Sequence, residues 1–538
     1  MTTPQERSGE AGGSGGDQWR PDPAGEMEAV IGLEIHIQLL TREKLFCTDV
    51  PEFGAEPNTR VCPVCLGLPG ALPVLNREAV ALAVRAALGF ECTIHERSIF
   101  ERKNYFYPDL PKGYQISQFQ EPLATDGILR VRTGEDSDGA FTVRIRRMHL
   151  EEDAGKSIHD RVPDRTAVDL NRTGTPLVEM VSEPDLRSPA QVRSYLDQVK
   201  RILEYLEVSD CNMEEGSLRV DANVSIRPAG SLELGTKTEL KNLNSFSGVE
   251  RALEVEIARQ VATVTAGGQV RHETLLWDER RQTVRPMRSK EESQDYRYFP
   301  DPDLPPVQVS PTWVEEIRRG MPELPEARRA RFMEAYGIPA YDAGVLTSRR
   351  PLADFFEASV QARSEAFAEG ERGEGPTRPH GRSGPETEGT KGPEVAKEVA
   401  NWVMGPILAL ANTRGEEVEA LGLDPRAVAE LVGLVATGRA NRRAARTILE
   451  RMVESGSGGP GAPEAILEAE GLAQVSDAHR IEGWVHEVLE AHPDEVTRFL
   501  EGERRLQGFF MGEIMKRSRG KADPGEVARI LGARLKGG

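Results

Sequence analysis

Alternating apolar and polar residues predict two strands that each have one packed face and one polar face. In Val30–Leu39 the odd-numbered residues are apolar, and in Arg219–Arg227 the even-numbered ones are. Successive side chains of a strand point to opposite faces, so the apolar residues of each segment share one side. The polar side chains on the opposite faces are Glu34, His36 and Gln38 of the first segment and Asp221, Asn223 and Ser225 of the second.

Apolar residues at helical spacing predict helices between these strands, at Asn76–Leu88, Pro189–Leu206 and Gly248–Val264. Beyond Pro311 the pattern is helical only. The helices predicted there are Pro322–Tyr336, Leu352–Gln361, Val395–Ala411, Asp424–Thr437, Asn441–Glu454, Ile481–Ala491, Pro493–Phe499 and Pro524–Leu535. This order predicts an α+β fold, with a mixed α/β domain followed by helical domains.

Composition shifts along the chain suggest four regions. Residues 1–26 are rich in Gly, Pro and acids, and we expect a disordered tail. A mixed α/β domain is predicted for 27–309 and an all-α domain for 310–420, with a flexible Gly- and Pro-rich insert at 363–395. A small all-α tail domain is predicted for 421–538.

Three polar positions on one strand face, Glu34, His36 and Gln38, offer groups that would converge on a cation. A solvent-exposed strand face fits the same pattern. Glu179 stands alone in an apolar run, where burying an unpaired carboxylate would be costly. Glu239 lies between lysines, which fits either a site role or an ordinary ion pair.

The densest acidic cluster is Glu151-Glu152-Asp153, followed by Ala-Gly-Lys-Ser. Its ending imitates a phosphate-binding loop, but the first glycine of that motif would fall on Leu150, so we reject the motif. Acids beside a phosphate site are consistent with Mg²⁺, which takes oxygen ligands and bridges to phosphate oxygens. A solvated acidic turn is the alternative.

Three of the five cysteines cluster in sequence. Cys62 and Cys65, with Cys47 upstream, resemble part of a zinc site, and Asp49 offers an oxygen ligand. Reduced, metal-free cysteines are the alternative. We expect Cys92 and Cys211 to be packing residues.

Acidic residues exceed basic ones by 87 to 68, a net charge of −19. On average this argues against a nucleic-acid partner, but nine Lys or Arg against three acids in 504–538 make a local basic region, and 438–451 adds five arginines. The candidate contacts to a nucleic-acid backbone are Arg439, Arg442, Arg443, Lys516, Arg517, Arg519 and Lys521.

No apolar run approaches the length of a membrane span, and we expect no membrane contact. The first 26 residues lack a secretory or transit pattern, so we expect a cytoplasmic protein. The Gly-Gly-Ser-Ser stretch of amidase-signature enzymes is missing, and we do not expect this chain to hydrolyse amides by itself.

Several long stretches of the chain match the pattern of a known family. They include Val30–His36, Val61–Gly70, Phe100–Asp109, Pro111–Phe119, His149–Ser157, Asp169–Pro176, Met213–Asn223, Leu240–Phe246 and Asp295–Asp303. Together they resemble the B subunits of aspartyl/glutamyl-tRNA amidotransferases, and the resemblance covers about 28–362 and 394–538. Pro322 opens helical sequence soon after Val307, which leaves no room for the extra domain of the related E type.

The resemblance implies a cradle-shaped catalytic domain, a helical domain and a tail domain that engages tRNA. It implies a carbon–nitrogen ligase that uses ATP and Mg²⁺ to phosphorylate the side-chain carboxylate of Glu-tRNA(Gln) or Asp-tRNA(Asn). Ammonia then displaces the phosphate. Glutamine hydrolysed by a separate amidase, the A component, supplies the ammonia, and a small C component completes a heterotrimer.

Matched position by position, the family's functional residues fall on two sets. The metal set, implied for Mg²⁺, is Glu34, His36, Glu151, Glu179, Asp221 and Glu239. The catalytic residues along the ammonia path would be Lys103, Lys112 and Glu152, together with Glu151. A tRNA-docking scaffold without catalysis is the alternative, but each matched acidic position is still acidic. A phosphohydrolase is a third interpretation.

Overall fold

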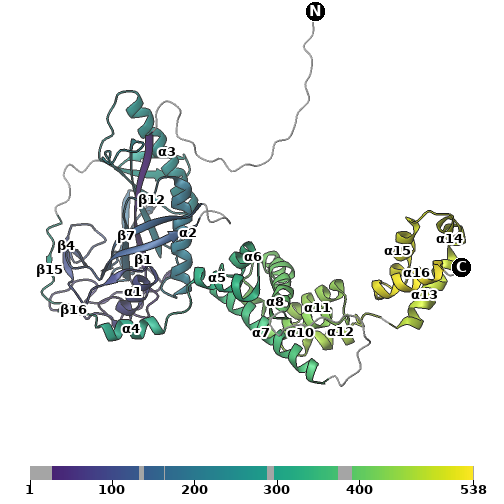
Figure 1. Cartoon of the computed structure of the whole chain (residues 1–538). Coiled ribbons are helices and arrows are strands. Elements are labelled where there is room, and N and C mark those ends of the chain that lie inside the picture. The colour runs from purple at the N-terminus through teal and green to yellow at the C-terminus, as the bar shows by residue number, and fades with distance from the viewer. Residues whose placement is uncertain are drawn as a thin grey trace, which may run out of the picture. The chain divides into compact units, whose positions relative to one another are not determined.

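The computed structural model describes residues 27–132, 139–162, 164–287, 296–373, 391–475 and 477–536 (Figure 1). The chain divides into two compact units, one ending at Leu324 and the other beginning at Pro325. The first unit combines sheets with helices, and the second is helical. The predicted α+β class, with a mixed domain followed by helices, is confirmed.

A nine-stranded sheet organises the first unit, in the order β14-β13-β12-β11-β1-β10-β7-β6-β2. Neighbouring strands are antiparallel except β12 and β13. The bounds are β1 Met27–Gln38, β2 Thr93–Ile94, β6 Ala124–Val131, β7 Phe141–Glu152, β10 Pro176–Ser182, β11 Leu218–Pro228, β12 Thr238–Leu243, β13 Thr274–Asp278 and β14 Thr283–Pro286. The two strands predicted from alternation are β1 and β11.

The apolar face of this sheet shares one core with helices α1 (Arg77–Gly89), α2 (Pro189–Tyr205) and α3 (Phe246–Thr265). The odd-numbered residues of β1 from Ile31 to Ile37 are buried there, as the alternation predicts. Each helix begins after an Asn or Ser whose side chain accepts hydrogen bonds from first-turn amides. The packed helices leave the polar side chains to the opposite face of the sheet.

In its described residues, the first unit also contains three smaller sheets made of short strands. β4 (Glu101–Asn104), β5 (Tyr114–Ser117) and β15 (Phe299–Pro300) form a three-stranded sheet. Two further pairs are β8 with β9 and β3 with β16. Their bounds are β3 Arg97–Ser98, β8 Lys156–Val162, β9 Arg165–Asp169 and β16 Val307–Gln308.

Helix α4 (Pro311–Arg319) belongs to the first unit, although the predicted domain boundary lay before it, at 309/310. Trp313 and Val314 pack against the core of the first unit, and the Arg77 guanidinium lies 4.6 Å from the Trp313 ring. A short amphipathic helix does not reveal in sequence which core it covers, so the boundary moves to 324/325.

The second unit contains two hydrophobic cores. One extends from Phe332 to Leu467 and the other from Ile481 to Leu535. The division between cores therefore lies well beyond the predicted boundary at 420/421. The helices are α5 Pro325–Tyr336, α6 Ala340–Leu346, α7 Arg350–Gly373, α8 Lys391–Trp402, α9 Leu408–Arg414, α10 Pro425–Ala436, α11 Arg442–Glu454, α12 Ala462–Ala469, α13 Ala478–Ala491, α14 Pro493–Leu500, α15 Leu506–Arg517 and α16 Pro524–Lys536.

Both ends of the predicted insert 363–395 are helical, because α7 extends to Gly373 and α8 begins at Lys391. The stretch 374–390 and the predicted tail 1–26 lie outside the described residues. A π-helix, η2 (Val403–Ile407), joins α8 to α9, and a 3₁₀ turn, η3, spans Val418–Leu421. In the described part of the chain, no helix has the length and hydropathy that crossing a bilayer requires.

Candidate functional site

The register of the large sheet aligns polar side chains across neighbouring strands. His36 of β1 lies opposite Glu179 of β10, and Glu179 lies opposite His149 of β7. On the other side of β1, Glu34 lies opposite Asp221 of β11. Directly opposed residues in an antiparallel pair share a face, so strands distant in sequence place these groups side by side.

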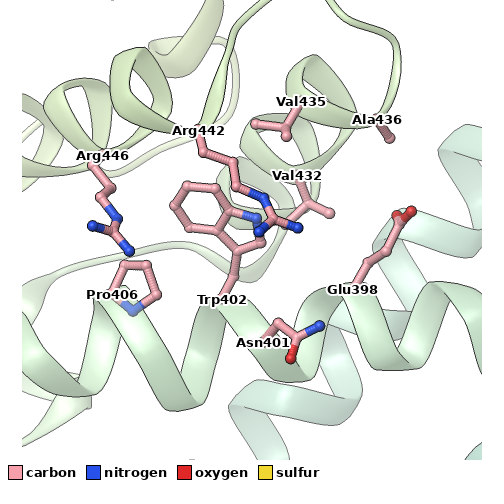
Figure 2. A pocket seen from close by; sticks show the side chains of 9 residues that line it. All are labelled: Glu398, Asn401, Trp402, Pro406, Val432, Val435, Ala436, Arg442 and Arg446. Atoms are coloured by element: carbon pink, nitrogen blue, oxygen red, sulfur yellow. The ribbon is translucent and has the colours of Figure 1, made fainter. Parts of the chain in front are cut away.

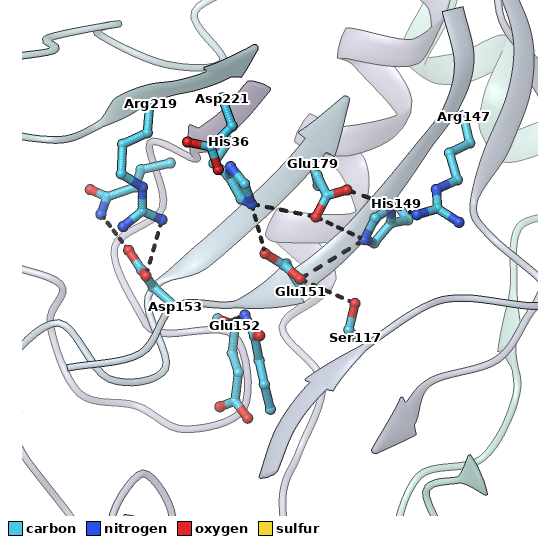
Figure 3. Close-up of polar contacts among 12 residues, drawn as sticks. His36, Ser117, Arg147, His149, Glu151, Glu152, Asp153, Glu179, Arg219 and Asp221 are labelled. Atoms are coloured by element: carbon cyan, nitrogen blue, oxygen red, sulfur yellow. Dashed lines mark hydrogen bonds and ion pairs between the residues drawn. The ribbon is translucent and has the colours of Figure 1, made fainter. Parts of the chain in front are cut away.

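Four residues on this face, His36, His149, Glu151 and Glu179, form what we call the histidine group (Figure 3). The Nε2 atom of His36 lies 3.4 Å from Glu179 Oε2 and 3.6 Å from Glu151 Oε1. The Nε2 atom of His149 lies 3.7 Å from Glu179 Oε2 and 3.9 Å from Glu151 Oε2. One ligand atom from each of His36, Glu151 and Glu179 falls within 4.8 Å of the other two, a spacing that suits a bound cation.

Both carboxylates of the histidine group are buried, and their neighbours keep them ionised. Burial alone would raise their pKa values, but the neighbouring imidazole of His149 lowers the pKa of Glu151. The charge of His149 and contacts with His36 likewise lower the pKa of Glu179. Burial opposes the positive charges of His36 and Lys103, yet the two carboxylates raise both of those pKa values. The histidine group therefore combines two buried carboxylates with imidazole rings that can gain or lose a proton.

His149 was missed as a site residue in the sequence, although it stands two positions before Glu151 in one strand. Side chains at that spacing share a face, and this signal would have found it. Its Nδ1 atom is buried without a hydrogen-bond partner. Ser117 of β5 adds a further contact, donating from Oγ to Glu151 Oε2 at 3.2 Å.

The other predicted metal residues form a second cluster, the lysine group, made of Asp221, Glu239 and Lys241. Lys241 Nζ lies 2.7 Å from Asp221 Oδ2 and 3.0 Å from Glu239 Oε1. Glu34 interacts with both groups, since burial and the charges of Glu179 and Glu239 raise its pKa. The six predicted metal ligands thus share one face, but Lys241 neutralises two of them.

Gln38 does not join His36 as the strand pattern suggested. Its Nε2 donates to Asp153 Oδ2 at 3.0 Å. Asp153 also binds Arg219 at 3.0 Å and lies 3.4 Å from Arg172. Burial would raise the pKa of Asp153, but these two cations lower it. The Gln38 amide nitrogen therefore belongs to a separate ionic cluster around Asp153.

The predicted ammonia-path residues divide between two places. Glu152 points away from Glu151 (Figure 3) and makes a buried ion pair with Lys112. Glu152 Oε1 also accepts the Ile116 amide at 3.0 Å. Lys103, by contrast, carries a charge that acts on Glu151, and its Nζ lies 5.0 Å from the Tyr296 ring centre.

The cysteine cluster includes Asp49, as the sequence suggested. Ligand atoms of Cys47, Asp49, Cys62 and Cys65 all lie within 4.8 Å of one another. The Cys62 amide donates to Cys65 Sγ at 3.0 Å, and a hydrogen bond with Cys47 lowers the pKa of Cys65 to about 6. Three thiols and one carboxylate offer a four-coordinate set. Cys92 and Cys211 are buried in the core, as predicted.

The predicted tRNA contacts differ in how their charges are neutralised. Arg439 pairs with Glu464, Arg517 lies 2.5 Å from Glu487, and Lys516 lies 3.7 Å from Glu513. Within the described residues, Arg442 and Arg443 of α11 have no ion-pair partner. The remaining two, Arg519 and Lys521, lie in the connection between α15 and α16.

Comparison with known proteins agrees with this architecture. The model of the GatB/GatE catalytic domain matches residues 29–315, and that of the GatB domain matches 387–535. The chain is 46% identical over 514 residues to the B subunit of the aspartyl/glutamyl-tRNA(Asn/Gln) amidotransferase from Carboxydothermus hydrogenoformans, covering 95% of this chain and 99% of the relative. It is 48% identical over 510 residues to the corresponding protein of Oleidesulfovibrio alaskensis, covering 95% and 99%. The chain therefore belongs to the family of aspartyl/glutamyl-tRNA(Asn/Gln) amidotransferase B subunits.

Proposed function

We propose that this chain carries the ATP-dependent step of a tRNA-dependent amidotransferase. Its substrate is Glu-tRNA(Gln), Asp-tRNA(Asn) or both, and its product is the corresponding amide. The observation that carries the proposal is the histidine group, in which His36, Glu151 and Glu179 bring ligand atoms within 4.8 Å of one another. The names of the relatives, aspartyl/glutamyl-tRNA(Asn/Gln) amidotransferases, support the substrate class.

The reaction has two balanced steps. The substrate's side-chain carboxylate oxygen attacks the γ-phosphorus of ATP, ADP leaves, and an acyl phosphate forms. Ammonia then attacks the carbonyl carbon, the C–O bond to phosphate breaks, and the amide nitrogen loses a proton. Activation is required because a carboxylate is a poor electrophile, and phosphorylation supplies a leaving group.

The histidine group fits Mg²⁺, with the buried oxygens of Glu151 and Glu179 as the principal ligands. When bound, Mg²⁺ would neutralise the charge of the transferring phosphate. His149 and Lys103 lower the pKa values of Glu151 and Glu179, so both carboxylates would carry the charge that binds the ion. We assign Glu34, Asp221 and Glu239 to the edge of the same site.

Ammonia would come from a partner, because the chain lacks the serine motif of amidases. We propose an amidase and a small third protein as partners in a heterotrimer. The buried Lys112–Glu152 pair would line the ammonia path toward Lys103 and Glu151. The cysteine cluster would hold structural zinc, with Asp49 as its oxygen ligand. The basic residues around α11 and α15 would contact tRNA.

The test uses the chain co-expressed and purified with its amidase and small partners. We expect formation of Gln-tRNA or Asn-tRNA that requires ATP, Mg²⁺ and either glutamine or added ammonia. Lys112→Met should reduce the glutamine-dependent rate about tenfold or more and leave the rate with added ammonia nearly unchanged, since only channelled ammonia uses that path. If the wild-type complex binds tRNA without ATP-dependent amidation, the chain is a docking scaffold and the proposal fails.

A further inference from the structure

A pocket in the helical unit lies outside the sheet and its acidic face. It has a volume of about 310 Å³ and lies between the helix that carries Trp402 and the facing helices α10 and α11 (Figure 2). A second pocket shares Pro406 and Arg446 with it, so the two pockets adjoin. The chemical steps proposed above do not use this pocket, although Arg442, a predicted tRNA contact, lines it.

The two ends of the pocket differ in charge. Arg442 and Arg446 stand one turn apart on α11. Figure 2 shows the Arg442 guanidinium near Trp402 and the Arg446 guanidinium near Pro406. Glu398 and Asn401 occupy the opposite end. In the part of the chain that the structure describes, neither guanidinium has an ion-pair partner. Two unpaired cations facing one pocket favour an anionic occupant.

The walls between these ends are apolar. Val432, Val435 and Ala436 of α10 line the pocket together with Trp402 and Pro406. The indole is only 8% exposed, so an occupant meets its rim rather than its full face. The described residues supply no acceptor for the indole N–H, which leaves it free to donate to a ligand. Flat aliphatic walls with a polar rim suit a planar ring more than a bare inorganic anion.

Local backbone features position these groups at some cost in stability. The π-helix Val403–Ile407 contains Pro406, and such bulges inside helices occur frequently at functional sites. Arg442 and Arg443 open α11, whose first turn holds no acidic residue. Cations at a helix N-terminus oppose the helix dipole, so this placement destabilises the helix unless an anion binds there.

We propose that this pocket is a nucleotide subsite for tRNA, an inference that rests on the proposed function. A phosphate of an unstacked nucleotide binds the guanidiniums of Arg442 and Arg446, and the base lies against the exposed rim of Trp402 and the valine wall. Glu398 and Asn401 then accept hydrogen bonds from amino groups of the base. RNA is favoured over an acidic peptide because the apolar walls leave space for a ring between the two polar ends.

The experiment measures binding of a tRNA(Gln) transcript to the purified complex, using an Arg442→Gln/Arg446→Gln double variant. Loss of two charge-assisted contacts should weaken binding about tenfold or more and flatten its salt dependence by about one to two units of log–log slope. The KM for misacylated tRNA should rise with it, while kcat stays unchanged. Trp402→Phe, which keeps an aromatic ring but removes the N–H, should weaken binding a few-fold.

The matched control is Arg414→Gln/Arg426→Gln, two arginines of the same helical unit that do not line the pocket. It should bind tRNA as the wild type does. Equal binding by the Arg442/Arg446 variant and this control would overturn the proposal. Loss of the partner proteins instead of tRNA would overturn it too and assign the pocket to a protein. Because transcript binding needs no chemistry, this result is independent of whether the wild-type complex amidates tRNA.

Discussion

The histidine group and the lysine group lie on one face of one sheet, yet their acidic side chains meet different cations. In the first, imidazoles stand beside Glu151 and Glu179. In the second, a single ammonium binds Asp221 and Glu239. An imidazole can release its proton and offer a lone pair to a metal, whereas an ammonium has donors only. The difference shows that carboxylates in a row on one sheet face can belong to different sites. Which site each belongs to depends on the cation beside it.

The largest effect should follow from neutralising the histidine group. Glu179→Gln keeps the shape but removes a buried charge, and we expect the ATP-dependent amidation rate to fall by at least about 100-fold. The measurement is single-turnover amidation of misacylated tRNA, with tRNA affinity as the control that should not change. A near-wild-type rate would remove Glu179 from the metal site.

A smaller effect is expected at His149, which we regard as a positioning residue. His149→Gln should lower the amidation rate about 10- to 100-fold, since residues that orient ligating carboxylates have effects of this size. The rate should recover partly at raised Mg²⁺ concentration, because the loss is one of metal affinity. A loss that Mg²⁺ does not alter would instead place His149 in a purely structural role.

The lysine group is tested by Lys241→Gln. Burial opposes the charge of Lys241, but Asp221 and Glu239 raise its pKa, so the side chain is an ammonium at neutral pH. Its removal should lower the free energy of unfolding by about 1 kcal/mol. Mg²⁺ should raise the melting temperature of this variant more than that of the wild type. Equal responses would show that Asp221 and Glu239 do not attract a divalent ion.

The smallest effect on amidation should come from Glu357→Gln, because the partners of Glu357 are two arginines and a tyrosine remote from the histidine group in sequence. Glu357 of the helical unit receives hydrogen bonds from Arg331 at 2.6 Å, Arg328 at 2.5 Å and Tyr336 at 3.0 Å. Burial opposes its charge, but the two arginines lower its pKa. Glu357→Gln should cost about 1–2 kcal/mol of unfolding free energy and leave amidation unchanged.

The lowered pKa of Glu357 predicts how the stability difference between the wild type and Glu357→Gln depends on pH. A carboxyl whose pKa is lowered on folding adds stability above its unfolded pKa, about 4.3, and loses it as the pH falls through the folded value. Urea unfolding at pH 7 should therefore show the full difference between wild type and Glu357→Gln, and unfolding near pH 3 a smaller one. A difference that stays constant over this range would contradict the assignment.

Local patterns predicted the strand faces and most helices, because side-chain periodicity is a property of neighbouring residues. The faces of β1 and β11 follow directly from alternation, and α10 and α11 lie within one or two residues of their predicted ends. Residue types also indicated that Asp49 accompanies the cysteines, and the structure brings them together.

Local sequence patterns could not predict which side chains from distant segments come into contact. Register across the sheet decides that His149 faces Glu179, and tertiary packing decides that Gln38 meets Asp153. Lys241 stood in the sequence only as a flank of Glu239, and its partner Asp221 lies on the next strand. Core membership is likewise collective, which explains why α4 joined the first unit and why the second core begins only near Ile481.

Lys241 bears on whether the protein folds before or after it binds a metal ion. A cation that is part of the chain is present from synthesis, whereas a dissolved metal ion must compete with nucleotides and nucleic acids for capture. With Asp221 and Glu239 already held by Lys241, that half of the acidic face can fold before any ion arrives. Folding of that half of the face would then be independent of the concentration of free magnesium, and only turnover would respond to it.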